Sequence, residues 1–286
     1  MEILLAVAIL GGLGLVFGLV LAAASKVFYV ETDPRLDKLN ECLPGANCGG
    51  CGYAGCGAYA EAVLNGEAEI GKCASGGNEC AQAMAAIMGV KAEAVTRRVA
   101  LVRCSGAKTY DADGQLVKGA KIKAKYEGFK DCLAASKVGG SGPLSCKYGC
   151  LGYGSCTKAC KYGAIKVVQG VAVVDEDLCV GCMACAAACP RQLIVPVEPN
   201  RNVVIACNSM AKGAATTRQC TVGCIGCGLC KKICPNEAIT IENNIARIDY
   251  SKCTQCGLCA TVCPKKLIKD SNVENLPDPS IPARNH

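Results

Sequence analysis

The stretch Cys224-Ile-Gly-Cys-Gly-Leu-Cys-Lys-Lys-Ile-Cys-Pro235 decides the fold of this chain. Its four cysteines are separated by two, two and three residues, and a proline follows the last. Crowded thiolates of this kind suit a [4Fe–4S] cube, which takes one ligand for each iron. An all-cysteine zinc site, the alternative, usually presents two separated C-x-x-C pairs. The same run recurs at Cys179–Pro190 and at Cys253–Pro264.

A fourth, degenerate copy precedes these three runs. Cys150, Cys156 and Cys160 keep their places in it, but Tyr153 stands where a second cysteine is expected. Cys146, which lies four residues before the copy, is the expected substitute. The first and second copies are as far apart in sequence as the third and fourth. The four copies therefore predict two tandem modules, each similar to a two-cluster bacterial ferredoxin.

In two-cluster ferredoxins the fourth cysteine of each run binds the cluster of the other run. This rule predicts four sets of ligands. They are Cys146, Cys150 and Cys156 with Cys189; Cys179, Cys182 and Cys185 with Cys160; Cys224, Cys227 and Cys230 with Cys263; and Cys253, Cys256 and Cys259 with Cys234.

A fifth set has a different pattern. Cys48, Cys51 and Cys56 lie within nine residues, and Cys73 follows. The glycines between them let the backbone fold tightly, so that its N–H groups can point at the sulfides of a cube. We expect one more [4Fe–4S] cluster here, for a total of five. The residues from Cys80 to Val95 are expected to form a helix.

Six cysteines remain outside these sets: Cys42, Cys80, Cys104, Cys132, Cys207 and Cys220. Four of them recur with the symmetry of the two modules, and one hypothesis is that Cys104, Cys132, Cys207 and Cys220 hold a sixth cluster. Cys220 lies at the repeat position of Cys146, so a second hypothesis makes these two alternative ligands. The third is that the leftover cysteines are buried free thiols.

Composition narrows the function further. The single histidine is the last residue, His286, which argues against His-ligated zinc, haem ligation and His-based catalytic pairs. No G-x-G-x-x-G follows a strand, so neither a nucleotide site nor a catalytic residue is expected. The net charge of +7 indicates either a solvated basic surface or attraction to anionic lipid or to an acidic protein partner; no nucleic acid is expected among the partners. The lysines that motivate the second interpretation are Lys121, Lys123, Lys125, Lys130, Lys231, Lys232, Lys265 and Lys266.

The N-terminal segment from Ile3 to Ala24 contains no charge. As a helix it would rise about 33 Å, enough for a hydrocarbon core of about 30 Å. A cleaved signal peptide is the alternative, because Ala22–Ser25 looks like a cleavage site, but no Lys or Arg precedes the segment. Lys26, Arg35 and Lys38 follow it. The chain is therefore expected to cross the cell membrane once, with its bulk in the cytoplasm.

The order of these features resembles the B subunit of the Rnf complexes, membrane-bound ferredoxin:NAD oxidoreductases that pump ions. The resemblance rests on the apolar N-terminal helix, on LPGANCGGCGYAGC at Leu43–Cys56 with Cys73, and on the ferredoxin runs. It implies a non-nucleotide-binding subunit of a translocase. Such a subunit accepts electrons from reduced soluble ferredoxin and relays them to other subunits of the complex. The alternative is a polyferredoxin that feeds electrons to another membrane oxidoreductase, such as a hydrogenase.

The predicted fold class is α+β, with one transmembrane helix, a small [4Fe–4S] module and two tandem ferredoxin-like modules. The expected divisions are a transmembrane anchor at 1–27, the [4Fe–4S] module at 28–95, an insertion with a hairpin at 96–135, the ferredoxin-like modules at 136–200 and 201–270, and a polar tail at 271–286.

Overall fold

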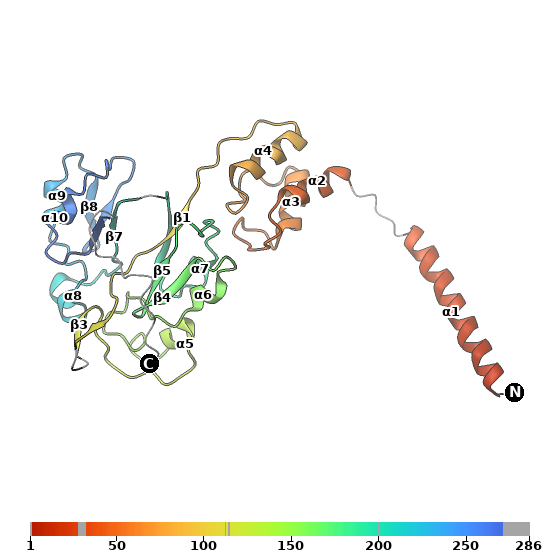
Figure 1. Ribbon diagram of the computed structural model, residues 1–286, viewed down its shortest axis with the longest axis horizontal. Helices are drawn as coiled ribbons and strands as arrows, with labels where there is room; N and C mark the ends of the chain where they lie inside the picture. The colour runs from red at the N-terminus through yellow and green to blue at the C-terminus, as the bar shows by residue number, and fades with distance from the viewer. Residues whose placement is uncertain (1, 28–32, 112, 114, 200, 271–286) are drawn as a thin grey trace.

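The computed structural model describes residues 2–27, 33–111, 113, 115–199 and 201–270, with backbone only for residues 2–9, 269 and 270. Three parts follow one another along the chain (Figure 1): an N-terminal helix, a helical module, and a larger body of short strands and helices. The expected polar tail lies outside the described residues.

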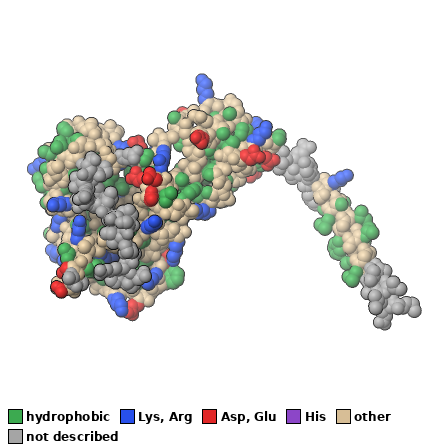
Figure 2. All heavy atoms as spheres, in the orientation of Figure 1, with side chains coloured by type: hydrophobic (Ala, Val, Ile, Leu, Met, Phe, Trp, Pro, Cys, Tyr) green, Lys and Arg blue, Asp and Glu red, His purple; other side chains and the backbone are tan. Residues whose placement is uncertain are grey.

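The N-terminal helix α1 extends from Glu2 to Val27, and the helix itself is therefore confirmed. Its apolar side chains from Leu10 to Leu21 are exposed and line the helix in Figure 2. Within the described part of the chain, no helix combines the length and the apolarity that crossing a membrane requires. The predicted membrane span is therefore not confirmed.

The helical module contains α2 (Pro34–Cys42), α3 (Cys56–Leu64) and α4 (Gly77–Met88). Asp33 caps α2 by accepting a hydrogen bond from the Arg35 backbone N–H. Leu39, Tyr59 and Met84 are fully buried where the three helices meet. The expected helix from Cys80 to Val95 is correct in its first half only. It ends at Met88 because Gly89 adopts a left-handed conformation (φ 67°) that closes the helix.

The body contains two copies of one strand arrangement. Each copy has a hairpin and a second antiparallel pair that joins its first and last strands. The first copy contains β1 (Val99–Val102), β4 (Ile165–Val168), β5 (Val171–Val174) and β6 (Ile194–Val197), with β4 paired to β5 and β1 to β6. The second contains β7 (Val203–Ile205), β8 (Ile239–Glu242), β9 (Ile245–Ile248) and β10 (Ile268–Asp270), with β8 paired to β9 and β7 to β10.

The two hairpins close through tight turns. Gln169 and Gly170 join β4 to β5, and Asn243 and Asn244 join β8 to β9. All four residues have positive φ, as a two-residue type I′ turn requires. In the second module, residues 239–248 thus form a small antiparallel ribbon.

Short helices connect the strands of both modules. They are α6 (Ser155–Ala159) and α7 (Ala184–Ala187) in the first module, and α8 (Gly213–Gln219), α9 (Leu229–Ile233) and α10 (Leu258–Thr261) in the second. In α6, α7, α9 and α10 the second residue is a buried cysteine: Cys156, Cys185, Cys230 and Cys259. Each of these helices therefore holds one thiol of a ferredoxin run inside its module.

The region expected as an insertion has two different parts. Strand β1, at its start, pairs with β6 and so belongs to the sheet of the first module. The remainder contains the short strands β2 (Thr109–Tyr110) and β3 (Leu116–Lys118), which form the expected hairpin, and the helix α5 (Cys132–Ser136). This remainder also touches the second module, since the Lys121 N–H donates to the Gln219 carbonyl at 2.9 Å.

Candidate metal centres

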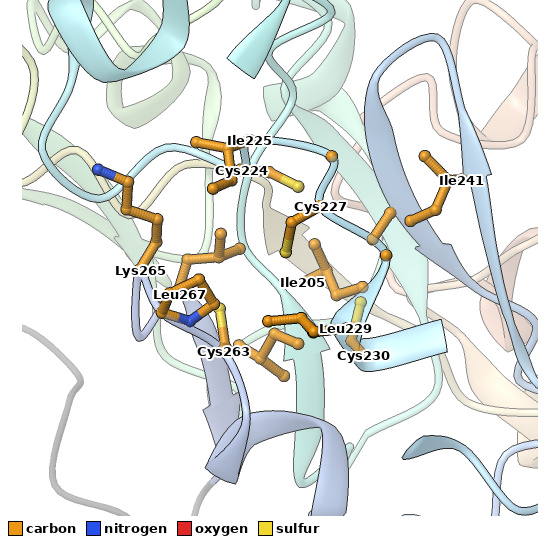
Figure 3. Close-up of a pocket in the computed structure, with 15 residues that line it drawn as sticks. Ile205, Cys224, Ile225, Cys227, Leu229, Cys230, Ile241, Cys263, Lys265 and Leu267 are labelled. Carbon is orange, nitrogen blue, oxygen red and sulfur yellow. The ribbon is translucent and has the colours of Figure 1, made fainter. Parts of the chain in front are cut away.

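One pocket lies in the second module and has a volume of about 370 Å³. Cys224, Cys227, Cys230 and Cys263 line it, and Figure 3 shows the sulfur atoms of all four directed toward the same space. We call these four residues the α9 set. Apolar side chains, among them Ile205, Ile241 and Leu267, form most of the rest of the wall. Cys224 and Cys230 are buried, whereas Cys227 is exposed. These are the four cysteines that the ferredoxin rule brings together.

A second pocket of about 340 Å³ lies on the other side of the same module. Cys234, Cys253, Cys256 and Cys259 line it; they form the α10 set. The Cys234 sulfur accepts a hydrogen bond from the Ala238 N–H at 3.4 Å. The structure therefore gathers both cysteine sets that the sequence predicts for the second module.

A pocket in the first module, with a volume of about 360 Å³, is lined by a different set of cysteines from the one predicted. Its wall contains four cysteines, which we call the α6 set: Cys132, Cys150, Cys156 and Cys189. Cys146, the predicted fourth member, is not among the described residues that line this pocket. Cys132 takes the place that the sequence analysis gave to Cys146.

The position of Cys132 follows from the start of α5. Asp131 caps this helix by accepting hydrogen bonds from the N–H groups of its second and third residues. The Cys132 N–H donates to the Ser155 hydroxyl at 2.8 Å, and that hydroxyl donates to Asp131 at 2.6 Å. Tyr153, at the site of the missing cysteine, packs on the ring of Tyr126 with the centroids 5.2 Å apart. Sequence spacing gives no sign of this arrangement, because α5 belongs to the inserted segment.

The other predicted set of the first module, the α7 set, consists of Cys160, Cys179, Cys182 and Cys185. The pKa of Cys185 is raised to about 12, chiefly by burial and then by the neighbouring thiols of Cys179, Cys182, Cys156 and Cys160. The Cys179 sulfur accepts a hydrogen bond from the Ala100 N–H at 3.4 Å. The four thiols are thus close enough to interact electrostatically.

A further group lies where the two modules meet. It consists of four buried cysteines, which we call the central set: Cys104, Cys146, Cys207 and Cys220. Burial raises the pKa of Cys220 to about 12, and the other three thiols add to the shift. Each module contributes two members. Cys104, Cys207 and Cys220 are three of the cysteines left over from the predicted runs, but the fourth member is Cys146 and not, as predicted, Cys132.

The hydrogen bonds of the central set repeat the symmetry of the modules. The Cys104 sulfur accepts from the N–H groups of Gly106 and Cys150, each at 3.4 Å. The Cys207 sulfur accepts from the N–H two residues later, at 3.5 Å, and from that of Cys224, at 3.4 Å. Cys150 and Cys224 begin corresponding runs. Both sulfurs are thus bonded in the same way. Burial raises the pKa of each thiol, and these backbone hydrogen bonds act in the opposite direction, by stabilising the thiolate.

The helical module contains the N-terminal set, Cys48, Cys51, Cys56 and Cys73, around a pocket of about 320 Å³. Ser75 lies beside it, with its hydroxyl oxygen 3.8 Å from the Cys48 sulfur and 3.6 Å from the Cys73 sulfur. The buried Cys80 thiol, which donates to the Met84 sulfur at 3.8 Å, also interacts with Cys73 and lowers its pKa. Cys182 of the α7 set lines the same pocket.

The donor sets fit iron–sulfur cubes. All 26 cysteines lie within the described residues and none forms a disulfide. Each set supplies four thiols, the number that a [4Fe–4S] cube requires. Within the described part of the chain, no three His, Cys, Asp or Glu side chains are arranged to hold a single metal ion.

Comparisons with known proteins place these sets in recognised families. The "Fe-S cluster" family model matches residues 43–75, the "4Fe-4S binding domain" model matches 171–194, and the "4Fe-4S dicluster domain" model matches 223–267. The chain is 43% identical over 252 residues to the B subunit of the "Na(+)-translocating ferredoxin:NAD(+) oxidoreductase complex" of Acetobacterium woodii, a match covering 88% of this chain and 73% of the relative. The chain belongs to this B-subunit family.

Other members of the B-subunit family match at similar levels. The protein of Methanosarcina acetivorans, the B subunit of an "ion-translocating oxidoreductase complex", is 38% identical over 87% of this chain and 90% of the relative. The protein of Clostridium ljungdahlii, from a "proton-translocating" complex, is 42% identical over 84% of this chain and 82% of the relative. These matches confirm the family that the sequence motifs indicated.

Proposed function

We propose that this chain is the electron-transferring B subunit of an ion-translocating ferredoxin:NAD⁺ oxidoreductase. In this role it accepts electrons from reduced ferredoxin and passes them to other subunits of the complex. The observation that carries the proposal is the repeated gathering of four thiols around pockets whose other lining residues are largely apolar. A [4Fe–4S] cube at such a site exchanges one electron, and the burial and hydrogen bonding of its ligands set its potential.

We further propose six clusters, one for each cysteine set. The sets together use all the cysteines except Cys42 and Cys80. The central set supports the sixth site because its four thiols are buried together and two of its sulfurs, those of Cys104 and Cys207, accept paired backbone hydrogen bonds. The α6 set, with Cys132, supports full ligation of the degenerate run.

Iron and sulfide analysis of the chain purified without air tests this proposal. Six clusters require about 24 irons per chain, whereas five require about 20. Cys104→Ser and Cys146→Ser should each disturb the same cluster and lose about four irons, and the double variant should lose no more than either single one. Cys42→Ser is the matched control and should keep the full content. A chain with zinc in place of iron would contradict the function, and a full content in Cys104→Ser would contradict the central cluster alone.

A basic cleft of about 950 Å³ between the modules suits an acidic electron donor. Its wall carries Arg98, Arg103, Arg201 and Arg247, and the one carboxylate among its described lining residues, Glu198, pairs with Arg201. Burial and the neighbouring Arg247 charge both lower the pKa of Arg103, whose buried Nε has no hydrogen-bond partner among the described residues. Guanidinium groups held together in this way would be stabilised by incoming carboxylates.

The cleft also lies against the central set. Arg103 immediately precedes Cys104 in the chain. Arg247 donates to the Cys207 carbonyl at 3.4 Å and to the Asn208 side chain at 3.1 Å. We therefore propose this cleft as the docking site for ferredoxin, because a donor bound there would lie next to a buried cysteine set. The sequence analysis based its docking hypothesis on lysines and missed these arginines, which are scattered along the chain.

We propose that α1 anchors the chain as a single-pass helix, with the bulk of the chain in the cytoplasm. The uncharged segment Ile3–Ala24 and the exposed apolar side chains of Leu15, Phe17 and Leu19 support this. Removing residues 2–27 should release the chain from membranes washed with alkaline carbonate. Retention of the shortened chain in membranes that lack the other subunits would contradict the anchor.

A further inference from the structure

Gly50 lies against the backbone of Cys182, more than 130 residues away in the chain. A Cβ atom added to Gly50 would overlap the Cys182 carbonyl oxygen and lie 3.0 Å from its Cα and 3.1 Å from its carbonyl carbon. Backbone atoms cannot rotate away as the end of a long side chain can. Gly50 does not have positive φ. Glycine is therefore required at this position because the two segments approach so closely, and not because of the local backbone conformation.

The contact joins two cysteine sets. Gly50 and Cys182 both line the pocket of the N-terminal set, while Cys182 is itself a member of the α7 set. The thiol of Cys48, in the N-terminal set, contributes to the raised pKa of Cys182, after the larger effect of burial. One segment of backbone therefore separates the two sites.

Lys161 forms a second contact between the two cysteine sets, near the junction where Gly50 meets Cys182; we call it the lysine clamp. The Lys161 ammonium donates to the backbone carbonyls of Ala46, at 2.7 Å, and Asn47, at 2.9 Å. Lys161 follows Cys160, a member of the α7 set, and the two carbonyls immediately precede Cys48. The clamp therefore ties the ligand loop of one set to a ligand of the other.

We propose that Gly50 and Lys161 are positioning residues that hold the N-terminal set and the α7 set at the separation needed for direct electron transfer between their clusters. This inference rests on the proposed function. The exchange moves one electron, so one cube is oxidised as the other is reduced, and no bond forms or breaks. Gly50 contributes the absence of a side chain, and Lys161 contributes the two charge-assisted hydrogen bonds.

Gly50→Ala in the full, iron-loaded chain tests the junction. The added methyl group must push the two segments apart, while the four thiols of each set remain present. The matched control is Gly57→Ala, in the same module, where a Cβ would meet nothing nearer than the Asn40 side-chain oxygen at 3.8 Å. The readout is the magnetic interaction between the two reduced clusters, seen as broadening or splitting in electron paramagnetic resonance spectra.

The wild-type chain and Gly57→Ala should show this interaction. Gly50→Ala should lose it while keeping its iron content. If Gly50→Ala also loses iron, Lys161→Gln decides the matter, since it removes the clamp without adding bulk and should weaken the interaction at full iron content. An unchanged interaction in a fully loaded Gly50→Ala or Lys161→Gln chain would overturn the junction. Such a result would leave the proposed function intact, whereas a wild-type chain without iron–sulfur clusters would end both.

Discussion

Ser75 shows how a single hydroxyl can tune one site of this chain. It lies within hydrogen-bonding range of two sulfurs of the N-terminal set, those of Cys48 and Cys73. A hydrogen bond to a cluster ligand stabilises the more negative, reduced state, and so raises the reduction potential. Ser75 is therefore expected to raise the reduction potential of the N-terminal cluster.

Replacing Ser75 by Ala should lower the potential of the N-terminal cluster without loss of iron, because the hydroxyl donates to the sulfurs but is not a ligand. A redox titration followed by electron paramagnetic resonance measures the shift. Ser75→Thr keeps a hydroxyl and should remain closer to the wild type. Equal potentials in the Ala variant and the wild type would show that the hydroxyl does not donate to these sulfurs.

Individual residues also show the limit of prediction from spacing. The structure brings together the α7, α9 and α10 sets that the sequence predicts, and the N-terminal set as well. In the first three of these sets every cysteine belongs to one of the repeated runs, and the spacing of the runs indicates which thiols meet. The spacing could not predict that Cys132 belongs to the α6 set and Cys146 to the central set. Cys132 lies in α5, which folds back from an inserted segment to reach Ser155. One signal was available: Cys220 has no place in a regular run, and Cys146 lies at its repeat position.

Among the elements, the five-residue helix α5 positions a thiol of the α6 set. Its cap on Asp131 and the bond from Cys132 to Ser155 hold one thiol of the α6 set in place. Loss of a helix cap typically costs about 1 kcal/mol. In a five-residue helix this is enough to affect whether the helix forms, and with it the position of Cys132.

Asp131→Ala should therefore weaken iron binding at the α6 set before any other set. The expected result is faster release of about four irons to a chelator, because Cys132 is no longer held at the pocket. The remaining irons should leave at the wild-type rate. Asp131→Asn is the control, since Asn caps helices about as well as Asp. A uniform acceleration across all irons would mean that the substitution destabilises the whole module.

The elements differ in how far the sequence predicts them. The β8–β9 ribbon could be predicted because its alternating residues flank Asn243 and Asn244, which favour a tight turn. Strand β1 was assigned to the insertion because its partner, β6, lies far along the chain. Pairing between distant strands leaves no local pattern. The early end of α4 had a local sign, Gly89, which outweighs the helix-forming residues around it.

At the scale of the whole molecule, the cysteine sets form a connected series. The α7 and α6 sets adjoin where the Cys156 thiol helps to raise the pKa of Cys185, and the α10 and α9 sets adjoin where the Cys230 thiol helps to raise the pKa of Cys259. The N-terminal and α7 sets share the wall at Gly50 and Cys182. The α6 and central sets are joined by the bond from the Cys150 N–H to the Cys104 sulfur. The central and α9 sets are joined in the same way, from Cys224 to Cys207. The central set thus links the two modules, and a donor docked beside it would reach the series at its middle.

Docking of ferredoxin at the arginine cleft can be tested by removing the charges of single arginines. Arg103→Gln and Arg247→Gln should each slow association with reduced ferredoxin, on the order of tenfold at low salt, because electrostatic steering of this kind raises on-rates by a factor of ten or more. Raising the salt concentration should slow the wild type toward the variants, as the Debye length shrinks to about 3 Å at 1 M. Lys118→Gln, which removes an exposed charge from the β2–β3 hairpin, is the matched control and should keep the wild-type rate. If Lys118→Gln slows association as much as the arginine variants do, the net charge of the chain attracts the donor, and the cleft has no special part in docking.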